Sequence, residues 1–186
     1  MSATPANVFV DGPLGRVFAR TAVPIAIIMS MNGALGIADA MFLGRYVGPR
    51  ALEAVTLIFP AFMALSALGV LIGGGMASIL ARLLGAGRHA EANAVFEATH
   101  GMALAMGAAL IALYAGLGTQ AIGALTGTGP VADMARGYFS ILVLASPVGL
   151  VLAAQSDALR SEGHTAFMAA GALLVSLSNI GFNYVL

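Results

Sequence analysis

The 186-residue sequence contains no cysteine, and only 9% of its residues are charged. Without cysteine the chain can form neither a disulfide nor a thiolate metal site, and its redox compartment cannot be inferred. Lysine is also absent, so all basic residues are arginine, which we attribute to genomic base composition. The formal net charge is zero, which argues against an electrostatic nucleic-acid interface and predicts no nucleic-acid partner.

Apolar residues dominate the composition. They make up 60% of the chain, and the mean hydropathy is +0.96. A soluble domain of this size could not cover so much apolar surface with so few charges. The composition therefore predicts an integral membrane protein. The N-terminal stretch before Gly15 has no basic segment ahead of a short apolar core, so it is predicted to be a short polar tail rather than a signal peptide.

Five apolar stretches are separated by short polar links. Alanine, leucine, glycine and methionine dominate them, which favours helices, and the ten-residue alternation of a membrane β-barrel is missing from the sequence. We predict an all-α fold with about five transmembrane helices in a single membrane domain over residues 1–186. The predicted spans are about 17–43, 52–84, 94–117, 138–158 and 165–186.

Arginine placement predicts the orientation of these spans. With five spans, one side of the membrane would hold Arg16, Arg20, Arg82, Arg88 and Arg160, and the other Arg45, Arg50 and Arg136. The larger group predicts a cytoplasmic N-terminus for a multi-pass protein of the cell inner (plasma) membrane. Leu186 would then end a helix at the outer face, so we expect the chain to be a truncated piece or a part of something larger.

Asp39 is the one charged residue between Arg20 and Arg45. A carboxylate at the centre of a membrane helix costs about 2.5–3.5 kcal/mol on insertion scales, and such residues commonly serve ions, protons or substrate. Asp39 lies about 27 Å along its span at 1.5 Å per residue, where an interfacial acid beside Arg45 is the alternative interpretation. Pro24 in the same span is predicted to kink the helix.

Asn179 and Asn183 share one face of the last predicted span, because they are four residues apart. They lie about 21 and 27 Å along it, in the same outer half of the membrane as Asp39. They are therefore predicted to line a cavity with Asp39 if the first and last spans are neighbours. The alternative is that they only hydrogen-bond adjacent helices.

Other polar groups have structural interpretations. Glycines around Gly73 predict close helix packing, Glu97 with His100 offers too few ligands for a metal site, and Asp157 with Arg160 can pair within one helical turn. The sequence contains no arrangement that resembles a nucleophile with a base and an orienting group. We therefore predict that the protein is not an enzyme and has no catalytic residues.

These features together resemble the N-terminal portion of MATE (multidrug and toxic compound extrusion) transporters. Five motifs carry the resemblance in the order of that family: Pro24 with Asp39 and the segment to Gly48, then Ala51–Pro60, Gly75–Gly87, Asp157–Gly163 and Asn179–Tyr184. The resemblance implies a twelve-helix transporter with two six-helix lobes, of which this chain would supply most of the first. It further implies efflux of organic cations or drugs by Na⁺ or H⁺ antiport.

The same resemblance implies a cation or proton site at Asp39 and Asn179. Many members of the family have a second aspartate where this chain has Asn183. Asp39 would therefore take up a proton by itself, or bind Na⁺ with Asn179 and Asn183 as neutral oxygen ligands. We expect no cofactor beyond the coupling ion and no other metal. The expected partners are a small cationic substrate, membrane lipid and the remaining helices of the transporter.

Two alternative functions stay open at this point. One is a flippase for a lipid or a lipid-linked oligosaccharide, from the same superfamily. The other is a fragment or scaffold without transport activity, or a half-size unit that works as a homodimer.

Overall fold

A computed structural model of the chain describes residues 13–185. The side chains that fall outside this description are those of Leu14, Arg16, Val17, Arg20, Thr21, Thr119, Ala121, Leu125, Thr126, Thr165, Asn183, Tyr184 and Val185. Over the described residues the chain consists of helices joined by short links, with no strand, which confirms the predicted all-α class.

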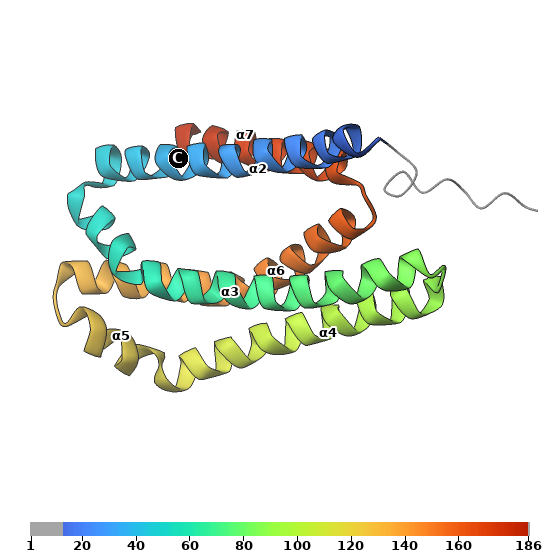
Figure 1. Cartoon of the computed structure of the whole chain (residues 1–186). Coiled ribbons are helices and arrows are strands. Elements are labelled where there is room, and N and C mark those ends of the chain that lie inside the picture. Colours follow the sequence, from blue (N-terminus) through green and yellow to red (C-terminus); the bar gives the residue numbers. More distant parts are fainter. Residues whose placement is uncertain (1–12, 186) are drawn as a thin grey trace, which may run out of the picture. The chain divides into compact units, whose positions relative to one another are not determined.

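Contacts within the chain divide it into two compact units, Met1–Ala38 with Gly163–Leu186 and Asp39–Glu162. The first unit holds most of α2 (Leu14–Phe42) and all of α7 (Thr165–Val185). The second unit begins at the end of α2 and contains the remaining elements (Figure 1). These are η1 (Leu43–Val47), α3 (Pro49–Gly85), α4 (His89–Leu113), η2 (Tyr114–Gly118), α5 (Thr119–Thr126) and α6 (Pro130–Ser161).

In the described part of the chain, four segments are long and apolar enough to cross a membrane, so the protein is a multi-pass membrane protein. They are Ala22–Val47, Pro49–Gly85, His89–Gly118 and Pro130–Ser161, with Ala166–Phe182 as a shorter apolar helix. Helix α6 begins at Pro130, because proline at the first helical position has a φ angle already suited to the helix. The short helix α5 precedes it, in a region predicted to be a link. The single-domain assignment over residues 1–186 stays a prediction.

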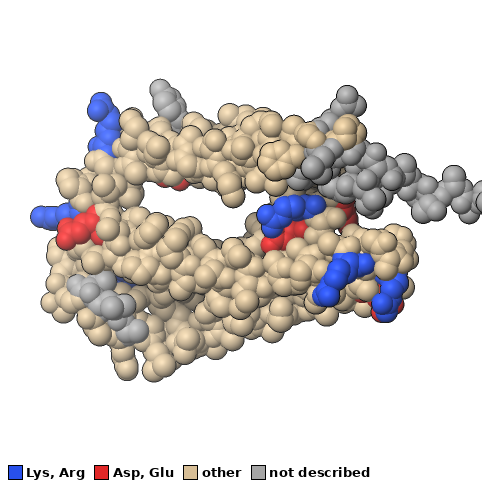
Figure 2. Space-filling view, in the orientation of Figure 1, with Lys and Arg blue, Asp and Glu red and all other residues tan. Residues whose placement is uncertain are grey.

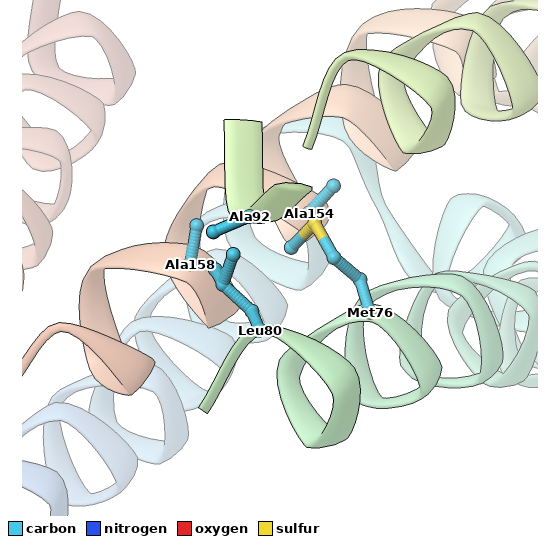
Figure 3. Close-up of a cluster of buried hydrophobic side chains, with 5 residues drawn as sticks. All are labelled: Met76, Leu80, Ala92, Ala154 and Ala158. Carbon is cyan, nitrogen blue, oxygen red and sulfur yellow. The ribbon is translucent and has the colours of Figure 1, made fainter. Parts of the chain in front are cut away.

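Helices α3 and α6 run parallel and pack along their lengths. Near the start of both, Ala54 and Ile58 cluster with Ala135. Near their ends, Met76 packs with Ala154. Helix α4 runs antiparallel to both and packs against each of them. Its Ala92 belongs to the second cluster (Figure 3). These three helices form the core of the second unit.

Small side chains allow the close approach of α3 and α6. Successive contacts at every fourth residue pair Gly69 with Ala153, Gly73 with Asp157, and Ala77 with Ser161. Membrane helices associate through this kind of small-residue stripe because van der Waals packing replaces the hydrophobic effect inside the bilayer. The predicted packing role therefore holds for Gly69 and Gly73. Gly74 and Gly75 were predicted to share it, but a Cβ at either position would meet no heavy atom within 4 Å.

Pro147 lies inside α6, where it cannot donate a hydrogen bond to the carbonyl of Val143. The buried hydroxyl of Ser146 donates to that carbonyl instead, at 2.7 Å. Such a local side-chain bond makes an internal proline tolerable in a membrane helix. Pro147 in turn lies against Gly107 of α4, so that a Cβ at Gly107 would fall 2.6 Å from the Pro147 Cα.

This contact predicts a matched pair of outcomes in α4. We expect Gly107→Ala to destabilise the protein by about 1–3 kcal/mol, because the added methyl group meets the rigid backbone and ring of Pro147. Gly101→Ala is the control, since a Cβ there meets nothing within 4 Å and alanine favours the helix. Thermal unfolding of both variants in detergent measures the difference. Equal melting temperatures would contradict the close packing at Gly107.

Candidate functional site

Asp39 lies one turn before the backbone of the first span changes from α-helix to π-helix. Helix α2 ends at Phe42 and continues as η1 to Val47, and the Gly48 N–H closes this segment on the Leu43 carbonyl at 3.0 Å. Asp39 itself is exposed. Single π-helical turns within α-helices are frequently found at functional sites. The structure thus adds a local backbone irregularity to the predicted site.

The sequence contained one signal of this irregularity. Gly48 has a φ of +108°, a conformation that favours glycine, and it belongs to the glycine pattern that follows Asp39. Within the turn, the rings of Phe42 and Tyr46 stack with centroids 5.6 Å apart. The π-helix itself was not predicted, since periodicity does not distinguish five π-helical residues from the end of an α-helix.

The other predicted site residues belong to the first unit. Asn179 is half-buried on α7, and Ser176, one turn earlier on the same face, is buried. Asn183 lies in the same helix, but its side chain is outside the described residues. Pro24 is an internal residue of α2, as predicted. Since Asp39 opens the second unit, its predicted grouping with Asn179 and Asn183 stays a prediction, as does the kink at Pro24.

A groove of about 610 Å³ runs between α3 and α6 in the second unit. Apolar residues such as Phe62, Val70 and Leu142 line most of its length. Its polar groups include the exposed Ser156 and a charged pair at one end. Ligand sites typically combine this kind of apolar wall with a few polar groups.

The charged pair is formed by Asp157 and Arg160, whose carboxylate and guanidinium are in direct contact. The Asp157 side chain is only 14% exposed, whereas that of Arg160 is 46% exposed. Asp157 points towards α3 at Gly73, where any Cβ would collide with the carboxylate and lie 3.3 Å from the Ala153 carbonyl. The pairing confirms the sequence interpretation, but the groove around it was missed, since the register of α3 against α6 cannot be read from the sequence.

Figure 2 shows that charged side chains are sparse on the face in view and that basic and acidic groups mostly adjoin one another. In the described part of the chain, ion pairs link side chains three residues apart. Arg88, which precedes α4, pairs with Glu91, and within α6 Arg136 pairs with Asp133 and Arg160 with Asp157. In the first two pairs the acid is 55% and 72% exposed. Asp157 therefore stands out as the acid that is largely withdrawn from solvent.

Glu97 and His100 lie on α4. The Nδ1 atom of His100 is 2.8 Å from the Phe96 carbonyl, and its ring lies against that of Phe96 at 4.2 Å. Within the described part of the chain, no three histidine, aspartate or glutamate side chains come together as a metal site. This helix contributes packing to the second unit.

Comparison with known proteins gives one family over most of the chain. A family model described as MatE matches residues 24–185. The FAD transporter of Shewanella oneidensis is 27% identical over 175 residues, which cover 91% of this chain and 37% of that protein. The multidrug export protein MepA of Staphylococcus aureus strain MRSA252 is 24% identical over 180 residues, 96% of this chain and 39% of that protein.

A solved structure has the same fold. It is described as the outward-facing conformation of a multidrug resistance MATE family transporter of the MOP superfamily, and it superposes on 98% of this chain and 40% of its own with a TM-score of 0.88 at 24% identity. The chain therefore spans less than half the length of these relatives.

The packing of Asp157 against α3 predicts a second matched pair. We expect Gly73→Ala to destabilise the protein by about 1–3 kcal/mol, because a methyl group there collides with the Asp157 carboxylate. Gly74→Ala is the control, since its Cβ meets nothing within 4 Å. In the double variant Gly73→Ala/Asp157→Ala, we expect thermal unfolding to show that the second substitution restores part of the stability lost through the first. Additive effects of the two substitutions would contradict a direct contact.

Proposed function

Because the chain belongs to the MatE family and forms most of the first helical lobe of that fold, we propose that it is part of a secondary active transporter. This transporter exports organic cations or drugs in exchange for Na⁺ or H⁺. The names of the relatives support transport as the activity: one is a multidrug export protein and another a FAD transporter. In a transporter of this kind the protein moves its substrate without changing it chemically.

Asp39 is the observation that carries the proposal. It is the one acidic residue in Ala22–Val47, a segment long and apolar enough to span a membrane, and a π-helical turn begins four residues after it. An ionisable group in such a segment is by default a functional group, because keeping a charge there is unfavourable. A proton or a Na⁺ ion would neutralise the carboxylate and so alter the packing that the surrounding helices prefer.

Asn179 and Asn183 complete the proposed cation site on α7. An amide cannot take up a proton, so these residues can only supply neutral oxygens to a bound ion or a hydrogen bond to Asp39. With H⁺ as the coupling ion, Asp39 performs the protonation alone; with Na⁺, it provides the negative charge and the two asparagines provide additional ligands. In either case the ion drives the cycle only through different affinities for the inward-facing and outward-facing states.

We orient the N-terminus towards the cytoplasm and assign the protein to the cell inner (plasma) membrane. The second unit supports this orientation, since Arg82, Arg88 and Arg160 lie at one end of the parallel α3 and α6, and Arg50 and Arg136 at the other. Together with Arg16 and Arg20 in the sequence, the first group is the larger, and arginine accumulates on the cytoplasmic side.

The flippase alternative requires a different electrostatic environment. A lipid-linked oligosaccharide carries pyrophosphate, which calls for several unpaired arginines or lysines in the cavity. In the described residues the α3–α6 groove holds one arginine, Arg160, and that residue is paired with Asp157. The charge balance thus favours a cationic or neutral substrate.

The proposal predicts that Asp39→Asn abolishes coupling. In vesicles containing the full-length protein, we expect efflux of a fluorescent organic cation driven by a Na⁺ or pH gradient to fall at least about tenfold, because the amide keeps the shape of the side chain but loses its charge. Asp133→Asn is the control, as Asp133 is an exposed acid on α6. Unchanged efflux by Asp39→Asn would remove this residue from coupling.

A further inference from the structure

The α3–α6 groove ends at a carboxylate that the proposed coupling site does not use. We propose that Asp157 is a second cation-binding group, which takes a lipophilic monovalent organic cation into the groove when Arg160 releases it. The assignment of this cation as the exported substrate rests on the proposed function. Binding itself does not, since it requires only the groove and its charged pair.

The unequal exposure of the two partners decides which of them binds a ligand. Arg160 is 46% exposed and can turn into water at little cost, whereas Asp157 is 14% exposed and lies between two packed helices. If the pair opens, the guanidinium is hydrated but the carboxylate stays withdrawn from water. A withdrawn carboxylate requires another positive partner, because an unpaired charge in such a place is strongly unfavourable. The groove therefore selects a cation rather than an anion.

The surroundings of Asp157 hold the carboxylate in place while its partner exchanges. Gly73 leaves room for it against the backbone of α3, and a Cβ at that position would force the carboxylate to shift. One turn further, the Ser161 hydroxyl lies 2.9 Å from the Asp157 carbonyl and 3.5 Å from the Ala77 carbonyl. This bond links the end of α6 to α3. Arg160 has no such link to α3 in the described contacts, so the arginine is the movable partner.

The walls of the groove match the apolar part of such a ligand. Its volume of about 610 Å³ is within the range of sites for small molecules, which is about 300–1,000 Å³. Aromatic and aliphatic side chains such as Phe62, Leu65 and Leu150 form the walls, and the buried Ser146 hydroxyl is already bonded within its own helix. Asp157 thus provides the counter-charge at one end of an apolar surface.

The other ion pairs provide an internal comparison. Arg88 with Glu91 has the same three-residue spacing at the start of α4, yet its acid is 55% exposed and neither residue lines the groove. Spacing alone therefore does not create the site. Substitution of Arg88 removes an equivalent arginine and pair without affecting the groove, which makes it a matched control.

Equilibrium binding of tetraphenylphosphonium to the purified full chain tests the inference. If Arg160 competes with the ligand for Asp157, Arg160→Gln should bind this cation about three- to tenfold more tightly than the unmodified protein. Asp157→Asn should weaken binding at least about tenfold, and in the double variant the gain from Arg160→Gln should disappear. Arg88→Gln should leave the affinity within twofold.

Folding is monitored in the same samples, because Arg160→Gln leaves a poorly solvated carboxylate without its partner. We expect Arg160→Gln to have a lower melting temperature than the unmodified protein. Tetraphenylphosphonium should raise the melting temperature of Arg160→Gln by more than that of the unmodified protein. If Arg160→Gln does not fold, Arg160→Lys replaces it in the binding experiment. Because lysine carries a more flexible point charge, its affinity for tetraphenylphosphonium should lie between those of the unmodified protein and Arg160→Gln.

Three results would overturn the inference. Weaker binding by Arg160→Gln with normal binding by Asp157→Asn would mean that the groove takes an anionic group, such as a lipid phosphate. Unchanged binding by Asp157→Asn would mean that apolar contacts alone hold the cation. Equal affinities of Arg160→Lys and the unmodified protein, together with no change in Arg160→Gln, would mean that the arginine does not compete.

The proposed function has a separate readout. Asp39→Asn should lose gradient-driven efflux while binding tetraphenylphosphonium within twofold of the unmodified protein. If Asp39→Asn loses efflux but the Asp157 and Arg160 variants bind tetraphenylphosphonium as the unmodified protein does, the groove inference fails and the proposed function stands.

Discussion

The close parallel approach of α3 and α6 is the constraint on which the second unit depends. Inside a bilayer two helices gain little from hiding apolar surface, so their backbones must come near enough for direct packing. Gly69, Gly73 and Ala77 allow this at successive turns of α3. The same contacts fix where Asp157 lies, because its carboxylate occupies the space beside Gly73. Packing and electrostatics in this unit therefore have a common origin in a stripe of small residues.

Asp157 and Asp39 have different electrostatic surroundings. Asp157 has an arginine one turn away and is neutralised within its own helix. Asp39 is the one acid of its membrane segment, and the helix geometry changes one turn after it. The chain also handles polar backbone groups locally, as where Ser146 bonds the carbonyl that Pro147 leaves without its N–H. In α6, the Asp157 carboxylate and the Val143 carbonyl are thus each compensated by a neighbour on the same helix.

The sequence was sufficient for the class of fold and for the short-range contacts. Composition and length indicated membrane helices, and a three-residue spacing indicated the Asp157–Arg160 pair, because both depend only on local geometry. The groove could not be foreseen, since it depends on which residues of α6 meet Gly69 and Gly73, about 84 positions away. The π-helix after Asp39 was missed for a different reason: its residues also suit an α-helix. The grouping of Asp39 with Asn179 and Asn183 stays a prediction.

The proposed roles of the two acids fit their separation within the second unit. The segment after Asp39 packs near the start of α3, where Gly44 lies close to Leu52, whereas Asp157 lies beside Gly73. Leu52 and Gly73 are about 31 Å apart along α3 at 1.5 Å per residue. A small organic cation is too short to reach both acids, so the coupling ion and the substrate would not compete for one carboxylate. If these proposed roles hold, exchange acts through helix packing, and the α3–α6 contact joins the two ends of the second unit.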